Sequence, residues 1–490
     1  CYFRPTFSTC MPENHAMKRI LLSVCLLSLV CAVSARADVR LPKVLGDHMV
    51  IQQNQPATIW GWAEAGEKVV VEMGESRGET KANADGKWSL KIDPPAAGGP
   101  YEVHVVGTNT IKLTDVLVGE VWICSGQSNM QWSVNRALNP AEEIAAAKYP
   151  NIRLFTVARI PAEEALEDCV GKGQAGWTDC NPGTIAGFTA VGYFFGRKLH
   201  QDLDVPVGLV NTSWGGTICE AWTSKPTLES DEDFAPILQR AATFKPGNPN
   251  QGSALYNGMI NPIVPLSMRG AIWYQGESNV ARAQQYAKLF PAMITDWRKS
   301  WNQGDFPFLF VQLAPFRYKG KDPKECAELW EAQLTTLSLP KTGMAVTTDI
   351  GNITNIHPKN KQEVGRRLAL WALALAHDKK LVHSGPLYEG LKVEGNKIRV
   401  SFNHVGGGLE AKGDKDLTHF EIAGADEKFV DATATIDGSA VVVQSDKVSK
   451  PVAVRFAWSD TAEPNLFNAE GLPASPFRSD DFKMVTADQR

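Results

Sequence analysis

Short apolar runs alternate with helix-like stretches over more than half of the chain, between Val116 and Asp378. The apolar runs have the length of strands and lie at residues 116–124, 152–157, 206–210, 271–274, 308–313 and 344–348. Helix-like stretches lie between or after them, at residues 188–200, 281–297, 326–337 and 359–377. Buried strands that alternate with helices predict an α/β fold, in which helices cover both faces of a parallel sheet.

Both flanks of this region have the short, alternating runs that are typical of β-strands. Before it, Asp85-Gly86 separates residues 82–84 from residues 87–92, which predicts a tight hairpin. After it, Gly395-Asn396 and Asp437-Gly438 separate further β-rich runs. We therefore divide the chain into a leader at 1–37, an N-terminal β-sandwich-like domain at 38–115, an α/β domain at 116–382 and a C-terminal β domain at 383–490.

The first 37 residues have the pattern of an export signal. Met17-Lys18-Arg19 precedes the apolar residues 20–33, and Ala35-Arg36-Ala37 follows them. This order is typical of a secretory signal peptide, here with cleavage before Asp38, and the apolar run is too short to span a bilayer comfortably. A lipoprotein signal at Cys31 is the weaker interpretation, because bulky Val30 precedes the cysteine. We expect an exported protein, periplasmic or secreted, with no membrane span.

The charge balance limits the partners of the chain. The sequence has 50 basic and 54 acidic side chains, and removal of residues 1–37 leaves 46 and 53, a net charge of −7. Such a balance argues against a generic nucleic-acid-binding surface. The 14 Trp and 9 Tyr residues are enough to form surfaces on which sugars stack, although composition alone does not assign them that role.

Five cysteines remain after the leader, at positions 124, 169, 180, 219 and 326. An odd number in an exported protein leaves at least one free thiol. Cys169 and Cys180 lie in one polar loop and are the pair that we expect to form a disulfide. No C-x-x-C pair occurs, which argues against a cysteine-based zinc or redox site.

Four polar blocks follow expected strands, at residues 124–130, 211–217, 275–279 and 356–358. In open α/β sheets the functional groups lie beyond the carboxyl ends of the strands. The first block offers a serine on a glycine turn, and the second offers paired glycines whose N–H groups can approach a ligand. Each block taken alone is also compatible with an ordinary turn. Together they predict a site at one edge of the sheet.

The chemistry of such a site would come from side chains. The sequence contains no H-E-x-x-H motif and no Walker loop, so we expect neither a metal nor a cofactor. Among the nine histidines, His357 follows a strand and precedes Pro358, which can open a helix. A neutral imidazole can take the proton of a serine hydroxyl, which is otherwise a weak nucleophile.

Taken together, the four blocks resemble those of the SGNH hydrolases, and their variants look like the sialate O-acetylesterase branch. The resemblance rests on Gly126-Gln127-Ser128-Asn129-Met130, Trp214-Gly215-Gly216-Thr217, Gln275-Gly276-Glu277-Ser278-Asn279 and Ile356-His357-Pro358. It implies a three-layer α/β/α, flavodoxin-like catalytic domain flanked by β-sandwich-like domains. It also implies a serine esterase that removes O-acetyl groups from sugars through an acetyl-enzyme and needs no cofactor.

The same resemblance implies roles for individual residues. Ser128 would be the nucleophile and His357 the general base. The backbone N–H of Ser128, that of Gly215 or Gly216, and the side chain of Asn279 would form the oxyanion hole. Gln127 and Glu277 would orient the loops around them.

One departure from the family pattern concerns the group that orients His357. Many members have an acidic residue two or three positions before this histidine, where the chain has Asn355 and Thr354. A Ser–His dyad oriented by Asn355 or by a backbone carbonyl is the interpretation that we favour. Asp349 at the preceding strand end could orient the ring instead, and reduced activity is a third alternative.

The expected substrate is an acetylated sugar. The nearest branch suggests 9-O-acetylated sialic acid, whereas acetylated xylan or pectin would suit the same chemistry. A carbohydrate-binding protein with weakened catalysis is the alternative of another class. A lipid esterase is disfavoured, because the sequence has no obvious apolar lid segment.

Overall fold

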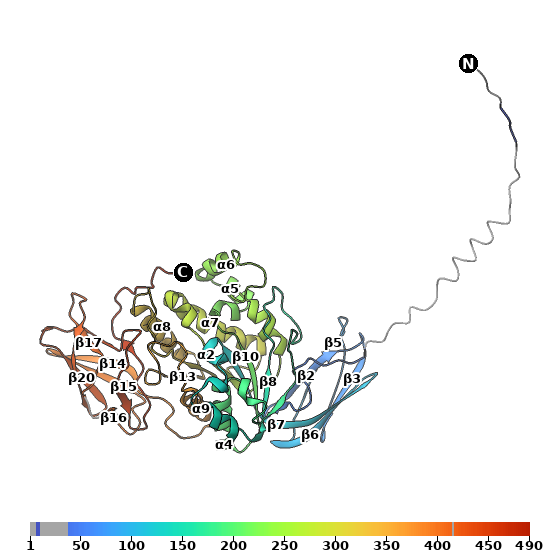
Figure 1. Ribbon diagram of the computed structural model, residues 1–490, viewed down its shortest axis with the longest axis horizontal. Helices are drawn as coiled ribbons and strands as arrows, with labels where there is room; N and C mark the ends of the chain where they lie inside the picture. Colours follow the sequence, from blue (N-terminus) through green and yellow to red (C-terminus); the bar gives the residue numbers. More distant parts are fainter. Residues whose placement is uncertain (1–5, 10–37, 414–415) are drawn as a thin grey trace.

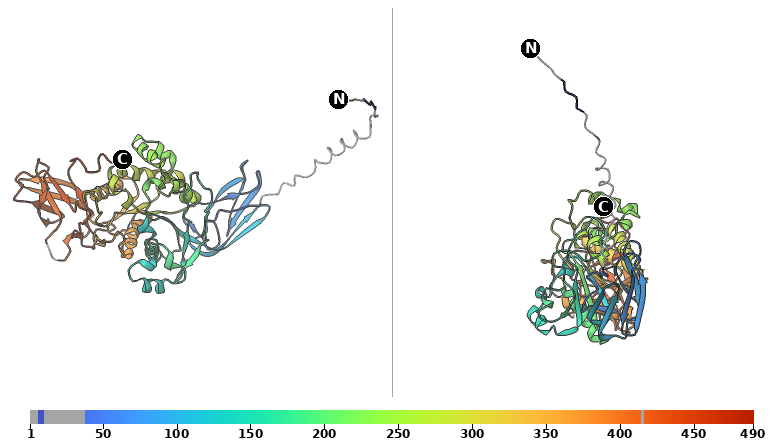
Figure 2. Two further views of the ribbon diagram at one scale, coloured as in Figure 1. Left: turned by 45° about the horizontal axis from the view of Figure 1, so that its top comes forward. Right: turned by 90° about the vertical axis from the view of Figure 1, so that its right-hand side faces the viewer.

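A computed structural model describes residues 6–9, 38–413 and 416–490, so the predicted signal peptide at residues 17–37 lies outside the described residues. The described part has an α/β region between two β-rich units, with the N-terminal unit at one end and the C-terminal unit at the other (Figures 1 and 2). No described helix is both long and apolar enough to cross a membrane.

The central sheet confirms the predicted α/β class. Its strands lie in the order β13-β12-β11-β7-β10-β8-β9, with all pairs parallel except β8 with β9. Without the edge strands β8 and β9, this is the flavodoxin-like order 2-1-3-4-5. The bounds are β7 Thr110–Gly126, β8 Tyr149–Thr156, β9 Thr178–Cys180, β10 Val207–Ser213, β11 Gly270–Tyr274, β12 Phe308–Val311 and β13 Thr342–Ala345.

Helices cover both faces of this sheet. On one face, α4 (Ala190–Leu203) packs beside α9 (Lys361–His377), and Phe195 meets Trp122 edge to face with ring centres 5.0 Å apart. On the other face lie α7 (Ala283–Trp301) and α8 (Lys324–Thr335), where Trp297 meets Trp273 edge to face at 5.9 Å. The short helices α3 Pro140–Ala146, α5 Lys225–Glu229 and α6 Ala235–Ala241 lie in the connections.

Helix α9 shows how its sequence fixes its position. Asn360 caps the first turn by accepting from the backbone N–H of Glu363 at 3.1 Å. Gly365 allows a close approach to α4, because a Cβ at this position would lie 2.7 Å from the Cβ of Phe194. Val364, Leu368 and Trp371 recur at spacings of four and three residues and are buried, so they form the apolar face of the helix.

The N-terminal unit is joined to the α/β region by a continuous strand. β7 pairs with β6 in its first half and with β10 and β11 in its second half. The boundary drawn between residues 115 and 116 therefore falls inside one strand, and a single hydrophobic core extends from the N-terminal strands into the α/β region. The other strands are β1 Val50–Gln52, β2 Ala57–Trp62, β3 Lys68–Met73, β4 Ser76–Lys81, β5 Lys87–Ile92 and β6 Gly98–Val106.

The hairpin predicted at Asp85-Gly86 is wrong in its pairing. The turn forms, because the Asn83 side chain accepts from the backbone N–H groups of Asp85 at 3.0 Å and Lys87 at 2.9 Å. The strands on its two sides pair elsewhere, however: β4 with β3 and β5 with β2. The turn thus carries the chain from one sheet of the unit to the other.

The C-terminal unit has a hydrophobic core of its own, which includes Val400, Val441, Ile422 and Phe456. Its two four-stranded sheets have the orders β14-β15-β20-β19 and β18-β17-β21-β23, and the hairpins predicted at residues 395–396 and 437–438 are confirmed. The bounds are β14 Leu387–Glu394, β15 Lys397–Asn403, β16 Leu409–Ala411, β17 Phe420–Ala423, β18 Val430–Asp431, β19 Thr433–Asp437, β20 Ala440–Gln444, β21 Ala453–Phe456, β22 Leu466–Asn468 and β23 Phe477–Arg478.

The disulfide expected between Cys169 and Cys180 is absent, and both are buried free thiols. Cys169 follows Asp168, which accepts from the backbone N–H of Lys43. Cys180 ends β9 and lies near the charged group of Arg197 on α4. The two thiols thus pack in different surroundings, and burial raises the pKa of each to about 12.

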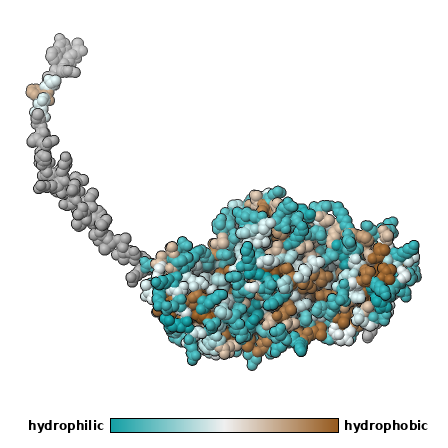
Figure 3. Space-filling view, turned by 180° about the vertical axis from the view of Figure 1, so that it is seen from behind, coloured by the Kyte–Doolittle hydropathy of each residue, from teal (hydrophilic) through white to brown (hydrophobic). Residues whose placement is uncertain are grey.

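The face of the molecule seen from behind is mostly hydrophilic, with groups of apolar residues between the polar ones (Figure 3). The large hydrophobic side chains that are exposed are Phe7, Leu138, Val170, Val393, Val452 and Val485. They come from separate segments, and scattered apolar residues of this kind are ordinary on folded proteins.

Candidate active site

Ser128 lies directly beyond the carboxyl end of β7, at the point where the strand order of the sheet reverses. Gly126 ends the strand with φ +132°, and a Cβ there would lie 2.2 Å from the carbonyl oxygen of Tyr274. Only glycine fits this close approach of two backbones. The helix after the turn, α2 (Ser128–Gln131), is only four residues long. A helix of this length has too small a dipole to hold negative charge by itself.

The structure brings Ser128 and His357 together from the first and fourth blocks. Their Oγ and Nε2 atoms are 2.9 Å apart, which is a hydrogen-bond distance. His357 was expected at the start of the last helix. It lies instead in the preceding loop, because α9 begins at Lys361 behind its Asn360 cap. The pair has the geometry that a nucleophile and its general base require.

The imidazole of His357 is held by an aromatic ring. Trp132 stacks on it, with ring centres 4.8 Å apart and planes inclined by 18°. The Asn355 side chain accepts from the backbone N–H of His357 at 3.0 Å, so it holds the loop and not the ring. Asp349 is committed to Arg367 through contacts of 2.6 and 2.8 Å. Among the described residues no hydrogen bond reaches Nδ1 of His357, so neither residue orients the ring as expected.

The surroundings of His357 favour its neutral form. Burial, and then the positive charges of Lys361 and Arg136, lower its pKa below the ordinary value of 6.5. The imidazole is therefore unprotonated at neutral pH and can accept the proton of Ser128.

Asn129 links three of the four blocks through its side-chain amide. Its Nδ2 donates to Oε1 of Glu277 at 2.5 Å and to the carbonyl of Ile356 at 3.0 Å. Its Oδ1 accepts from Nζ of Lys361 at 2.6 Å. Because Ile356 directly precedes His357, Asn129 fixes the loop that carries the base. The contact of Glu277 with Asn129 is compatible with the orienting role expected of Glu277.

Lys361 and Glu277 are ionisable groups within this network. Burial lowers the pKa of Lys361 to about 7, although the charge of Glu277 opposes the shift. Burial raises the pKa of Glu277, and Oε2 of this residue is buried without a partner among the described residues. The ammonium of Lys361 also lies over the ring of Tyr274, 5.0 Å from its centre.

Gln127 joins the first and third blocks. Its Oε1 accepts from the backbone N–H groups of Gly276 and Ser278, both at 3.3 Å. A Cβ on Gly276, which has φ +150°, would lie 2.8 Å from Leu329. The role expected of Gln127 as an orienting residue fits these contacts.

The second block lies against the nucleophile, and one of its two glycine donors is already engaged. A Cβ on Gly215 would lie 3.2 Å from the Cβ of Ser128, so this glycine borders the serine. Its backbone N–H donates to Oε1 of Gln131 at 2.6 Å, however, and is not free for an oxyanion in this conformation. The N–H groups of Ser128 and Gly216 donate to no acceptor among the described residues. These two are therefore the candidate oxyanion donors.

The side chain of Asn279, an expected oxyanion donor, is bound within the protein. Its Nδ2 donates to Oε2 of Glu220 at 2.8 Å, and its Oδ1 accepts from Gln275 at 2.7 Å. Glu220 is fully buried and is paired with Arg240 and Arg282. One amide proton of Asn279 is thus committed, which leaves a single proton for any other acceptor.

Among the described residues, no group of three or more His, Cys, Asp or Glu side chains is arranged to hold a metal ion.

The sequence of this α/β region matches a known family. The model of the family described as "Carbohydrate esterase, sialic acid-specific acetylesterase" matches residues 118–374, which is more than half of the chain. The chain belongs to this family of carbohydrate esterases. The match begins in β7 and ends in α9, so it contains all four polar blocks.

Individual relatives of the esterase extend the likeness to the flanking units. Human sialate O-acetylesterase is 32% identical over 91% of this chain and 93% of its own length. The mouse protein of the same name is 33% identical over 74% of this chain and 78% of its own. A crystal structure described as a novel carbohydrate acetylesterase from Xanthomonas citri is 39% identical and covers 91% of this chain and all of that one, with a TM-score of 0.84.

Sequence reasoning missed several side chains of the esterase site. Trp132 follows Ser128 by four residues, at the end of α2, a spacing that places both on one side of a helical turn. Lys361 follows the loop of His357 as the first residue of α9 and has no such spacing signal. Gln131 and Arg136 carry no comparable signal. Their roles depend on contacts between segments that are far apart in the sequence.

Proposed function

We propose that this carbohydrate esterase hydrolyses O-acetyl esters of sugars with Ser128 as nucleophile and His357 as general base. The observation that carries the proposal is the 2.9 Å contact between Oγ and Nε2. It is supported by the low pKa of His357, which keeps the base unprotonated near neutral pH.

In the first step, Oγ of Ser128 attacks the acetyl carbonyl carbon while its proton passes to Nε2 of His357. The tetrahedral intermediate collapses when the sugar oxygen leaves and takes that proton, which leaves an acetyl-serine. Water then attacks the acetyl-serine with His357 again as base, and acetate and free Ser128 are released. The backbone N–H groups of Ser128 and Gly216 stabilise the oxyanion in both steps.

The proposed mechanism works without a carboxylate on His357. In a triad the carboxylate holds the imidazole in one tautomer and stabilises its charged form. Here the stack on Trp132 fixes the plane of the ring, and the hydrogen bond from His357 N–H to Asn355 fixes the loop. The imidazolium gains no charge partner, so the site supplies less stabilisation to this intermediate than a full triad.

For the substrate we propose an acetylated sialic acid, with the 9-O-acetyl group as the expected position. Arg136 is exposed beside the dyad, with Cζ 5.5 Å from the centre of the Trp132 ring. Its charge reaches His357, and it forms no ion pair with any described acidic side chain. A guanidinium in this place suits the carboxylate of a sialic acid. The sialate O-acetylesterases among the relatives agree with this choice.

We also propose that the protein is exported after cleavage near Ala37. The support is the basic, apolar and A-x-A order of residues 17–37. Expression with this segment in a bacterium, followed by N-terminal sequencing of the exported fraction, tests it. Asp38 as first residue is expected, and retention of residues 1–37 in the cytoplasm contradicts it.

Acetate release from a panel of acetylated sialosides and acetylated xylan tests the reaction and the substrate together. Ser128→Ala should abolish release from every substrate. Arg136→Gln should raise KM for sialosides and leave the KM for acetylated xylan unchanged. Equal turnover by Ser128→Ala refutes the mechanism. A higher kcat/KM on xylan than on sialosides, unaffected by Arg136→Gln, refutes the substrate and favours a polysaccharide esterase.

A further inference from the structure

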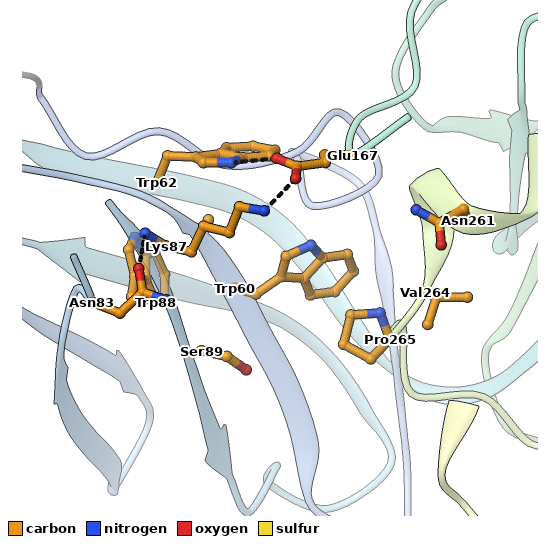
Figure 4. Close-up of a pocket in the computed structure, with 11 residues that line it drawn as sticks. Trp60, Trp62, Asn83, Lys87, Trp88, Ser89, Glu167, Asn261, Val264 and Pro265 are labelled. Atoms are coloured by element: carbon orange, nitrogen blue, oxygen red, sulfur yellow. Dashed lines mark hydrogen bonds and ion pairs between the residues drawn. The ribbon is translucent and has the colours of Figure 1, made fainter. Parts of the chain in front are cut away.

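A pocket lies between the N-terminal unit and the α/β region (Figure 4), and neither Ser128 nor His357 lines it. Its volume of about 390 Å³ is in the range of small-molecule sites. β2 and β5 form one side, and loops that carry Glu167, Asn261 and Pro265 form the other. Pro265 lies before the first residue of β11, whereas Ser128 lies beyond the carboxyl edge of the sheet. The length of β11, five residues or roughly 17 Å, therefore separates the pocket from the edge that carries Ser128.

Three tryptophans line this pocket, Trp60 and Trp62 on β2 and Trp88 on β5. Trp60 and Trp62 are two residues apart on β2, so both side chains leave the same face of the strand. Figure 4 shows the Trp60 ring in the centre of the pocket, between Pro265 and the group formed by Trp62, Lys87 and Glu167. The guanidinium carbon of Arg40 lies 5.2 Å from the centre of the Trp62 ring and helps to fix it.

Polar groups with both donor and acceptor capacity surround these rings. The indole N–H of Trp62 donates to Oε2 of Glu167 at 3.3 Å, and Lys87 forms an ion pair with the same carboxylate. Asn261 donates from Nδ2 to the carbonyl of Leu166 at 2.8 Å, which leaves its Oδ1 as an acceptor. The hydroxyl of Ser89 is exposed at the rim. Since Lys87 and Glu167 compensate each other, the lining carries no net charge.

We propose that this pocket is a non-catalytic binding site for a neutral pyranoside unit of a glycan. The C–H face of a pyranose can pack on the electron-rich face of an indole, and its hydroxyls need both donors and acceptors. The lining offers these groups and no unpaired charge, unlike the surroundings of Arg136. The esterase would thus hold a neutral part of a glycan at a place that is separate from the reacting ester. This proposal is independent of the roles of Ser128 and His357.

Binding is measured by isothermal titration on the full chain with Ser128→Ala, which removes the proposed nucleophile. The probes are xylohexaose and cellohexaose as neutral chains and polysialic acid as an anionic one. At least one neutral probe should bind, and Trp62→Ala should weaken it about tenfold or more. Glu167→Gln should also weaken it. The matched control is Tyr101→Ala, an aromatic residue of the same unit outside the pocket, which should leave the affinity unchanged.

Three results overturn the proposal: no binding of either neutral chain, equal affinity in the parent and Trp62→Ala proteins, or tighter binding of polysialic acid that depends on Trp62. A second measurement guards against a folding defect. With Ser128 intact, Trp62→Ala should hydrolyse 4-nitrophenyl acetate at the parental rate. Loss of that activity would mean that Trp62 has a structural role, and it would contradict the proposal.

Discussion

Asn129 is the residue whose loss should disturb the site most without touching the reacting atoms. Its amide makes three hydrogen bonds, to Glu277, to the carbonyl of Ile356 and from Lys361, and each partner atom is buried or part-buried. Asn129→Ala removes all three at once. A buried group without its partner costs about 1–3 kcal/mol, so the three together cost on the order of 5 kcal/mol of stability. At roughly 2–4 °C per kcal/mol, the melting temperature should fall by roughly 10–20 °C.

Asn129→Asp separates the effect on catalysis from that on packing. The carboxylate keeps the volume of the side chain and can accept from Lys361. It donates to neither Ile356 nor Glu277, and it repels the carboxyl of Glu277. The released Ile356 carbonyl should let His357 move from its 2.9 Å contact, so we expect kcat to fall by at least about tenfold.

Calorimetry and the hydrolysis of 4-nitrophenyl acetate check both variants. Asn135→Ala is the matched control, because Asn135 is exposed and its side chain contacts only Ser133 among the described residues. This control should stay within about 0.5 kcal/mol of the parent protein in stability. Parental melting temperature and parental kcat in both Asn129 variants would refute the view that this amide holds the base in place.

Three further predictions follow from the site and the thiols. Because kcat/KM needs neutral His357, its value should fall on acidification with an apparent pKa below 6.5. Arg136→Gln removes a positive charge near the ring, so it should raise this apparent pKa. An apparent pKa of 6.5 or above in the parent protein contradicts the prediction. Trp132→Ala should lower kcat by about 2- to 13-fold, which is equivalent to the loss of about 0.5–1.5 kcal/mol of ring stacking on His357. Trp132→Phe should restore part of the lost kcat. The melting temperature of both variants should stay within a few degrees of the parent value. Thiol titration of the denatured, unreduced chain 38–490 should find all five cysteines, and a count of three would indicate that Cys169 and Cys180 are bonded after all.

The sequence predicted the α/β sheet because its strands are short, apolar and separated by helices, which is a local signal. It also placed Ser128, Gln127, Glu277 and His357 at one edge, because the carboxyl ends of parallel strands converge there. The hairpins of the C-terminal unit were predictable for the same reason, since each joins strands that are adjacent in the chain.

Other features depended on partners that are distant in the sequence. The turn at Asp85-Gly86 was found, but β5 pairs with β2, and only the assembled sandwich decides that pairing. The engagement of the Gly215 N–H by Gln131 joins residues 84 positions apart. Asp349 was a reasonable orienting group by position, yet the bidentate pair with Arg367 on α9 holds it away from the base.

Ser128, activated by His357, is proposed as the nucleophile of this carbohydrate esterase. Incubation of the full chain with a fluorophosphonate, followed by mass spectrometry of its peptides, tests this role. We expect one stoichiometric adduct on Ser128, formed much more slowly after His357→Ala and not at all after Ser128→Ala. An unmodified Ser128 in an enzyme that still releases acetate, or an adduct on another serine that abolishes the activity, would contradict it.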